Sequence, residues 1–190
     1  MAIAVRTDSF VAPTLTQQSI YDGLKVAFSN AGYSAPFDEY TSGTEKSVVY
    51  EITLDATKTY GKTYLRVYVT TSLGIGEQLV STWNPTTHVG TNASAAVGSA
   101  NFSSNVALNF ISLNGHPESK LVLPYQGNSY FPLGYIAPEN KPSWWDLNSW
   151  NYAFVITSSN FATYRSTALN PLGNVDNETG LITWVRMSTA

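Results

Sequence analysis

The chain has 190 residues, of which 43% are hydrophobic and 13% aromatic, which fits one folded domain over residues 1–190 and excludes a disordered chain. Only 12% of the residues are charged and the net charge is −3 without a basic stripe, so we expect no nucleic-acid binding. The absence of cysteine excludes disulfides and thiolate metal sites. No apolar run approaches the roughly 20 residues that span a bilayer, and we expect no membrane contact.

The first predicted element is a helix from Leu15 to Ala31. Thr14 followed by Gln17 fits a capping box at its start. Gly32 stands where a left-handed residue would end it. Its apolar residues repeat with a 3.6-residue period and define one buried face, made of Ile20, Leu24, Ala27 and Phe28.

A β-hairpin is predicted to follow the helix. Apolar and polar residues alternate from Lys46 to Leu54 and again from Thr63 to Thr71, which is typical of half-buried strands. The connection between them is short and contains Gly61. Residues 14–71 therefore form a helix-plus-hairpin unit, and the next segment, 73–83, fits either a short helix or a strand.

The segment 84–105 is small, polar and uncharged. A stretch of this length without structure is uncommon inside a compact domain. It is either an extended loop or arm that becomes ordered against a neighbouring molecule, or two short strands with a surface loop. On the first interpretation, its candidate contact residues are Asn84, His88 and Phe102.

The rest of the chain is predicted to be β structure with tight turns, including one at Asn114-Gly115. The predicted strands are Val106–Leu113, Leu121–Tyr125, Tyr130–Ile136, Ala153–Thr157 and Leu181–Arg186. The fold class is therefore α+β, mainly antiparallel β in a sandwich-like sheet, with one N-terminal amphipathic helix.

Reactive constellations are missing from the sequence. The two histidines, His88 and His116, have no ligand at metal-binding spacing, and there is neither a nucleophile elbow nor a phosphate loop. We expect no enzyme activity, no metal and no cofactor. Paired carboxylates leave a glycoside hydrolase as an alternative, because their pairing is spatial. The candidates are Asp38, Glu39, Glu118, Glu139 and Asp146, with Asp146 and one of Glu118 or Glu139 as the acid pair.

Aromatic residues are concentrated in the segment 141–152. Its candidate contact residues are Trp144, Trp145, Trp150 and Tyr152. Such a cluster is an interface hot spot, a glycan-stacking platform of a carbohydrate-binding module, or a plug that closes one end of the core. The second interpretation is our main alternative function.

The order of elements resembles structural proteins of tailed bacteriophages. The resemblance rests on the helix that contains residues 17–25 and ends at Ala31-Gly32-Tyr33, on the hairpin directly after it, and on a Cys-free, Thr/Asn/Ser-rich β region with the aromatic turn 142–146. Residues 14–71 look like the opening of small tail-terminator or tail-completion proteins, which form rings. The longer C-terminal portion is also similar to adaptor and baseplate subunits.

This resemblance implies a virion structural protein of the tail or neck, made in the host cytoplasm. Its partners would be copies of itself in a ring and neighbouring tail or neck proteins. A low-charge surface rich in Ser, Thr and Asn suits such wide lateral contacts, and unpaired strand edges suit strand addition.

Overall fold

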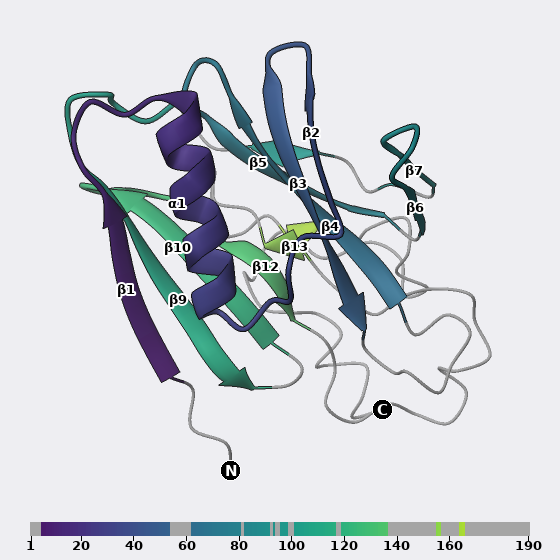
Figure 1. The fold of residues 1–190 in the computed structure, drawn as a ribbon. Coiled ribbons are helices and arrows are strands. Elements are labelled where there is room, and N and C mark those ends of the chain that lie inside the picture. The colour runs from purple at the N-terminus through teal and green to yellow at the C-terminus, as the bar shows by residue number, and fades with distance from the viewer. Residues whose placement is uncertain are drawn as a thin grey trace.

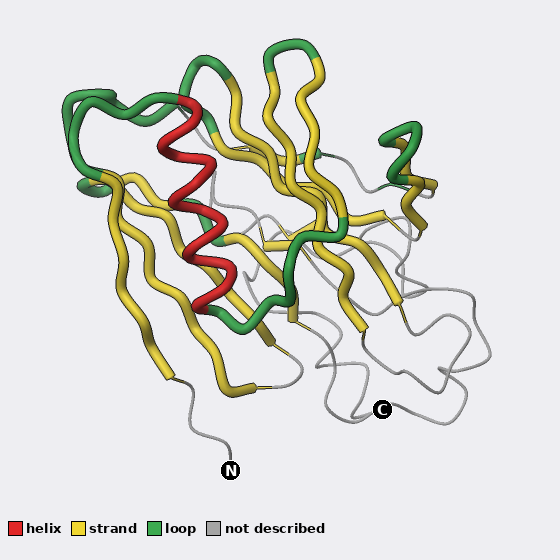
Figure 2. Tube along the Cα trace, in the orientation of Figure 1, coloured by secondary structure: helices red, strands yellow, loops and turns green. Residues whose placement is uncertain are grey.

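The computed structural model describes residues 5–53, 62–80, 82–91, 93, 96–98, 101–116, 119–136, 155–156 and 164–165. These residues contain one helix and several antiparallel sheets (Figure 1), which confirms the predicted α+β class. The tube drawn in Figure 2 shows the strands in two groups, with the helix beside both.

The first sheet is built from distant parts of the chain. Its order is β1-β9-β10-β11, with β12 also paired to β10, and all of its pairs are antiparallel. The strands are β1 (Val5–Val11), β9 (Leu108–His116), β10 (Ser119–Gln126), β11 (Ser129–Tyr130) and β12 (Leu133–Ile136).

The second sheet follows the chain more closely, in the order β2-β3-β4-β5-β8. Its strands are β2 (Asp38–Ser42), β3 (Glu45–Thr53), β4 (Lys62–Thr70), β5 (Ile75–Val80) and β8 (Val97–Gly98). Two small pairs complete the described structure: β6 (Thr82–Asn84) with β7 (Val89–Thr91), and β13 (Val155–Ile156) with β14 (Tyr164–Arg165).

The helix α1 (Gln17–Asn30) is confirmed, but the predicted N-cap is wrong. Thr16, not Thr14, caps the helix, and its side chain accepts a hydrogen bond from the backbone N–H of Ser19. Thr14 has φ +75°, whereas the N-cap residue Thr16 has the extended backbone that this position requires; the N–H groups of Thr14 and Leu15 donate to the carbonyl of Ser104, across the fold. Gly32 ends the helix with φ +83°, as predicted.

The core lies where the apolar face of α1 meets the inner faces of both sheets. Ile20, Leu24 and Phe28 are completely buried. Phe28 stacks on Tyr50 of β3, with ring centroids 4.8 Å apart, and Ser112 of β9 donates a hydrogen bond to the Ala27 carbonyl at 2.8 Å. The helix therefore holds together two sheets whose strands are far apart in sequence.

The ladder of hydrogen bonds corrects one local prediction and decides between the alternatives of another. Asn114-Gly115 is not a turn, because β9 continues to His116 and Asn114 pairs with Val5 of β1. For the segment 73–83 the strand alternative is confirmed, since β5 covers Ile75–Val80 and β6 begins at Thr82. In the described part of 84–105, β7 and β8 are short strands, closer to the second interpretation of that segment than to an arm.

Candidate functional site

The first candidate site is the free edge of β1. The order of the first sheet leaves β1 at its border, hydrogen-bonded to β9 on one side. Among the residues that the structure describes, no strand pairs with its other side, and Figure 1 shows β1 at the margin of the molecule. A seven-residue edge strand is a template for pairing with another chain unless it is shortened, charged or covered.

Successive side chains of a strand point to opposite faces of the sheet. The two faces of the first sheet differ in how deeply these side chains are buried. On the face toward α1, Leu108, Phe110 and Ser112 of β9 are buried. On the outer face the apolar side chains are only half-buried. They are Ile111 and Leu113 of β9 and Leu121 and Leu123 of β10, which stand directly opposite one another in the ladder.

The outer face continues onto β1 through Arg6, Asp8 and Phe10. Asp8 is paired with Ile111 and Arg6 with Leu113, so these side chains share the outer face. Phe10 is 69% exposed, although it is a large apolar residue. We call the set of outer-face residues at this edge the β1 surface: Arg6, Asp8, Phe10, Ile111, Leu113, Leu121 and Leu123.

The charges of the β1 surface are paired within the strand. Arg6 donates from Nε to Asp8 Oδ1 at 2.8 Å and from Nη2 to Asp8 Oδ2 at 2.9 Å. The hydrogen bond from Arg6 lowers the pKa of the Asp8 carboxyl, and the hydrogen bond to Asp8 raises the pKa of Arg6. Both groups are therefore charged at neutral pH, and β1 carries one charge of each sign.

A second cluster lies on the far side of the second sheet, where the β6–β7 hairpin covers β2. Asp38 Oδ2 accepts a hydrogen bond from Trp83 Nε1 at 2.8 Å and lies 2.8 Å from His88 Nδ1. Because the carboxylate only accepts, the His88 ring carries a proton on Nδ1. Tyr40 stacks on His88, with centroids 4.4 Å apart, and lies 5.8 Å from Trp83. These contacts lock the hairpin to the sheet.

Asp38 and Glu39 do not form the carboxylate pair that a glycosidase needs. They are neighbours on β2 and therefore point to opposite faces of the sheet. Glu39 instead accepts from Lys25 at 2.7 Å and from Tyr21 at 2.7 Å, and the Lys25 bond is the main cause of its lowered pKa. The other three candidate carboxylates, Glu118, Glu139 and Asp146, lie outside the described residues.

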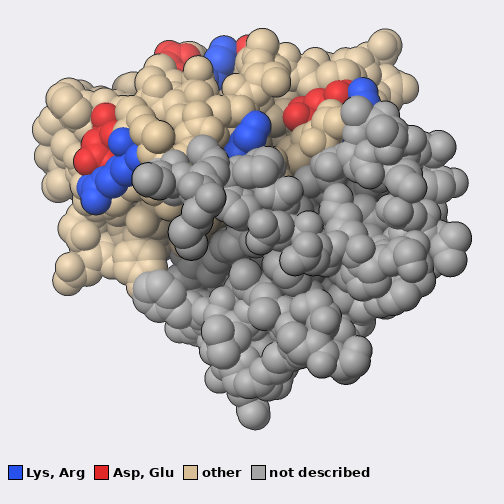
Figure 3. Space-filling model, turned by 90° about the horizontal axis from the view of Figure 1, so that it is seen from below, with Lys and Arg blue, Asp and Glu red and all other residues tan. Residues whose placement is uncertain are grey.

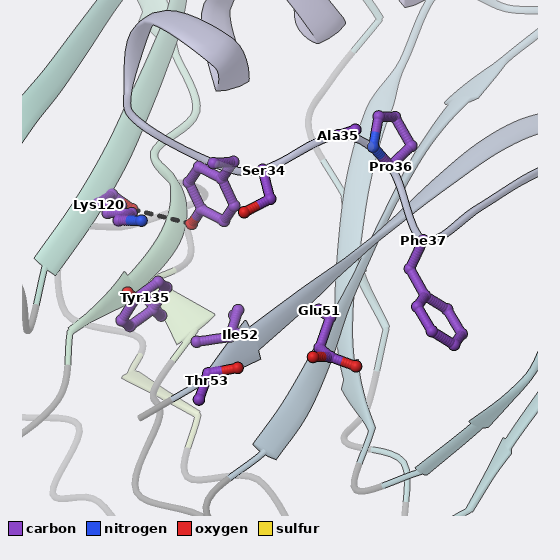
Figure 4. A pocket seen from close by; sticks show the side chains of 10 residues that line it. Ser34, Ala35, Pro36, Phe37, Glu51, Ile52, Thr53, Lys120 and Tyr135 are labelled. Carbon is purple, nitrogen blue, oxygen red and sulfur yellow. Dashed lines mark hydrogen bonds between the residues drawn. The ribbon is translucent and has the colours of Figure 1, made fainter. Parts of the chain in front are cut away.

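A pocket of about 470 Å³ lies between the loop after α1 and the ends of β3 and β12 (Figure 4). Its charged residues, Glu51 and Lys120, already have partners: Glu51 pairs with Lys62 at 2.8 Å, and Lys120 donates to the carbonyl of Gly32 at 2.6 Å. Lys120 thereby caps the C-terminal end of α1. The polar groups here support the fold, and no nucleophile is paired with a base among the described lining residues.

The predicted site residues fall into three groups: some lie on the β6–β7 hairpin, one lies in the core, and the others are outside the described residues. Asn84 and His88 lie on the β6–β7 hairpin, where the Asn84 side chain accepts from the N–H of Thr86 at 2.9 Å and closes the turn. The prediction that Phe102 contacts a neighbouring molecule is wrong, because Phe102 is only 6% exposed and its ring packs in the core. Predicted contacts that lie outside the described residues are Trp144, Trp145, Trp150 and Tyr152.

Three searches of the chain against known proteins, using family models, curated sequences and solved structures, found no match. Within the described residues, no group of three or more His, Asp or Glu side chains is arranged to hold a metal ion. No helix in the same residues has the length and apolarity needed to cross a bilayer.

The β1 surface was not predicted from the sequence. A signal was present, since Val5, Thr7, Ser9 and Val11 alternate with Arg6, Asp8 and Phe10. However, the segment contains too few apolar residues to mark a strand by itself. Its pairing with β9, about 100 residues later in the chain, is what makes it an edge.

Proposed function

We propose that this chain is a structural subunit, without enzymatic activity, that assembles with copies of itself and with neighbouring proteins. The observation that carries the proposal is the β1 surface, a seven-residue strand edge that no other described strand pairs with, with an exposed Phe10 beside a half-buried apolar sheet face. Strand addition by another chain typically occurs at an open strand edge that exposes apolar surface.

The low charge of the surface favours wide contacts with other proteins over the electrostatic attraction of a charged ligand. In the face seen in Figure 3, charged side chains of the described residues stand mostly in small groups that contain both signs, separated by uncharged surface. When two proteins meet, removing water from neutral, polar surfaces of this kind costs less free energy than removing it from charged surfaces, and there is no repulsion between like charges.

The assembly we propose is the virion of a tailed bacteriophage, with this chain as a tail or neck subunit of the terminator, adaptor or baseplate type. This step rests on the resemblance in element order, in which an N-terminal helix precedes a long hairpin. In the fold, α1 precedes the β3–β4 hairpin, but β1 stands before the helix and β2 lies between the helix and the hairpin.

Sedimentation velocity over a concentration series tests the proposal. We expect a concentration-dependent oligomer, and we expect Phe10→Ser to weaken it, because Phe10 is the most exposed apolar residue of the edge. Val26→Ser is the matched control, since Val26 is 53% exposed on α1, away from β1. A chain that stays monomeric at high concentration, and that binds no purified phage tail, would rule the proposal out.

A further inference from the structure

The charges on β1 restrict how its free edge pairs with another strand. Arg6 and Asp8 are two residues apart, so both lie on the outer face, and Thr7 between them faces inward. No other residue of the strand is charged. A partner strand therefore complements this edge best when it places a negative charge opposite Arg6 and a positive charge opposite Asp8.

A second copy of β1 meets this requirement in one antiparallel register. With Thr7 opposite Thr7 of the second copy, Arg6 faces Asp8 of the second copy, and Asp8 faces its Arg6. Centring the pair on residue 6 would oppose two arginines, and centring it on residue 8 would oppose two aspartates. Like charges directly opposite each other destabilise a strand pair.

We propose that β1 pairs antiparallel with β1 of a second copy, centred on Thr7, and joins two first sheets into one continuous sheet. The inference rests on the proposed function and specifies its partner and geometry. The same register places Val5, which is 60% exposed, opposite Ser9 of the second copy. The apolar outer faces of the two copies then adjoin across the new pair of strands.

This contact has two-fold symmetry, because each copy contributes the same strand to it. A two-fold contact closes on itself and does not propagate. Any ring built from it must therefore contain an even number of copies, or consist of two rings joined face to face. Growth around such a ring would use other surfaces of the subunit.

Charge reversal tests the register. Arg6→Asp and Asp8→Arg each oppose two pairs of like charges in the dimer, and each should raise the dissociation constant about tenfold or more in sedimentation equilibrium. The double variant Arg6→Asp/Asp8→Arg restores complementarity between copies and should return to within about threefold of the parent. Lys62→Glu, which reverses an exposed charge on β4 away from the edge, is the control.

A cysteine cross-link provides a second measurement that does not depend on the charge variants. The chain has no native cysteine, so Thr7→Cys introduces a single thiol at the two-fold axis. Directly opposed strand residues have Cβ atoms about 4.5–5.5 Å apart, which is near the range that a disulfide spans. Mild oxidation should give a linked dimer rapidly, whereas Ser42→Cys, on the edge strand β2, should not.

The outcomes separate this inference from the proposed function. If the parent chain associates but single reversals leave its dissociation constant unchanged, or the double variant fails to recover, the register is wrong and assembly stands. Slow cross-linking of Thr7→Cys, no faster than that of Ser42→Cys, would also overturn the register. A parent that neither associates nor binds phage tails overturns the proposed function itself.

Discussion

At the scale of single residues, Glu77 is the most unusual side chain of the core. It is completely buried between the sheets, where Oε2 accepts a hydrogen bond from the N–H of Gly134 at 2.9 Å. Oε1 has no hydrogen-bond partner among the residues that the structure describes. Burial raises the pKa of this carboxyl well above its usual value, and the bond from Gly134 offsets only part of that. The neutral acid is therefore the form that suits the fold.

Glu77→Gln should stabilise the protein at neutral pH and have little effect at low pH. Below a pH of about 4.5, Glu77 is protonated in both the folded and unfolded chain. As the pH rises above that value, the unfolded carboxyl ionises while the folded one stays neutral. The parent then loses up to about 1.4 kcal/mol of stability per pH unit until the folded pKa is reached, and the variant does not.

Thermal unfolding followed by circular dichroism between about pH 4 and pH 8 measures this difference. Glu51→Gln is the control, because Glu51 is a half-buried carboxylate of β3 that is paired with Lys62 at the surface. A stabilisation by Glu77→Gln that was the same at both ends of the pH range would contradict the neutral state of the buried acid.

The Asp38 side chain connects β2 to the β6–β7 hairpin. Asp38→Ala leaves Trp83 Nε1 and His88 Nδ1 without their acceptor and should lower the free energy of unfolding by about 1–3 kcal/mol. Urea unfolding checks this value. Asp22→Ala, which removes an exposed acceptor of a Gln18 hydrogen bond on α1, should cost about 0.5 kcal/mol or less. If both variants lowered the free energy of unfolding equally, the idea that Asp38 connects β2 to the hairpin would be wrong.

At the scale of elements, Gly23 sets how closely α1 approaches the first sheet. A Cβ atom at this position would lie 2.4 Å from Val11 Cγ2 of β1 and 3.2 Å from Phe110 Cε2 of β9. The helix therefore packs on the sheet at a distance that only glycine permits. Val11 is β-branched, and its side chain has few alternative rotamers with which to move aside.

Gly23→Ala should destabilise the protein by about 1–3 kcal/mol through overpacking. In an exposed helix position the same change would stabilise by about 1 kcal/mol, because alanine is the better helix former. The sign of the effect in urea unfolding thus decides between close packing and simple helix propensity. Ser29→Ala, on the exposed side of α1, is the control and should be neutral or slightly stabilising.

At the scale of the whole molecule, the two sheets end in edges of different character. The edge strand β2 has five residues, and its Asp38 and Glu39 are both acidic. Short, charged edges resist pairing with other chains. The edge strand β1 has seven residues, opposite charges that cancel, and an exposed Phe10. The assembly we propose should therefore use the edge of β1 and leave the edge of β2 unpaired.

Hydrogen–deuterium exchange at low and high protein concentration tests this difference. Amides of β1 should become protected as the concentration rises, because strand pairing gives the outward N–H groups new acceptors. Amides of β2 should exchange at the same rate under both conditions. Protection of β2 in place of β1 would contradict the assignment of the edge.

The sequence by itself determined the elements whose pattern is local. The 3.6-residue spacing of Ile20, Leu24 and Phe28 predicted α1 and its buried face, and the alternation of apolar and polar residues predicted the hairpin strands β3 and β4. Both patterns are contained within a few neighbouring residues. Gly32 is a similar case, since the end of a helix favours glycine for reasons of backbone conformation alone.

The tertiary structure alone decided the features that join distant segments. Ser104 accepts from the N–H groups of Thr14 and Leu15 just before the helix, and Asn114-Gly115 belongs to β9, where Asn114 pairs with Val5 of β1. Asp38 and His88 meet across 50 residues, and β1 becomes an edge only by pairing with β9. Such contacts depend on which surfaces come together after the chain has folded, and no periodicity along the sequence records them.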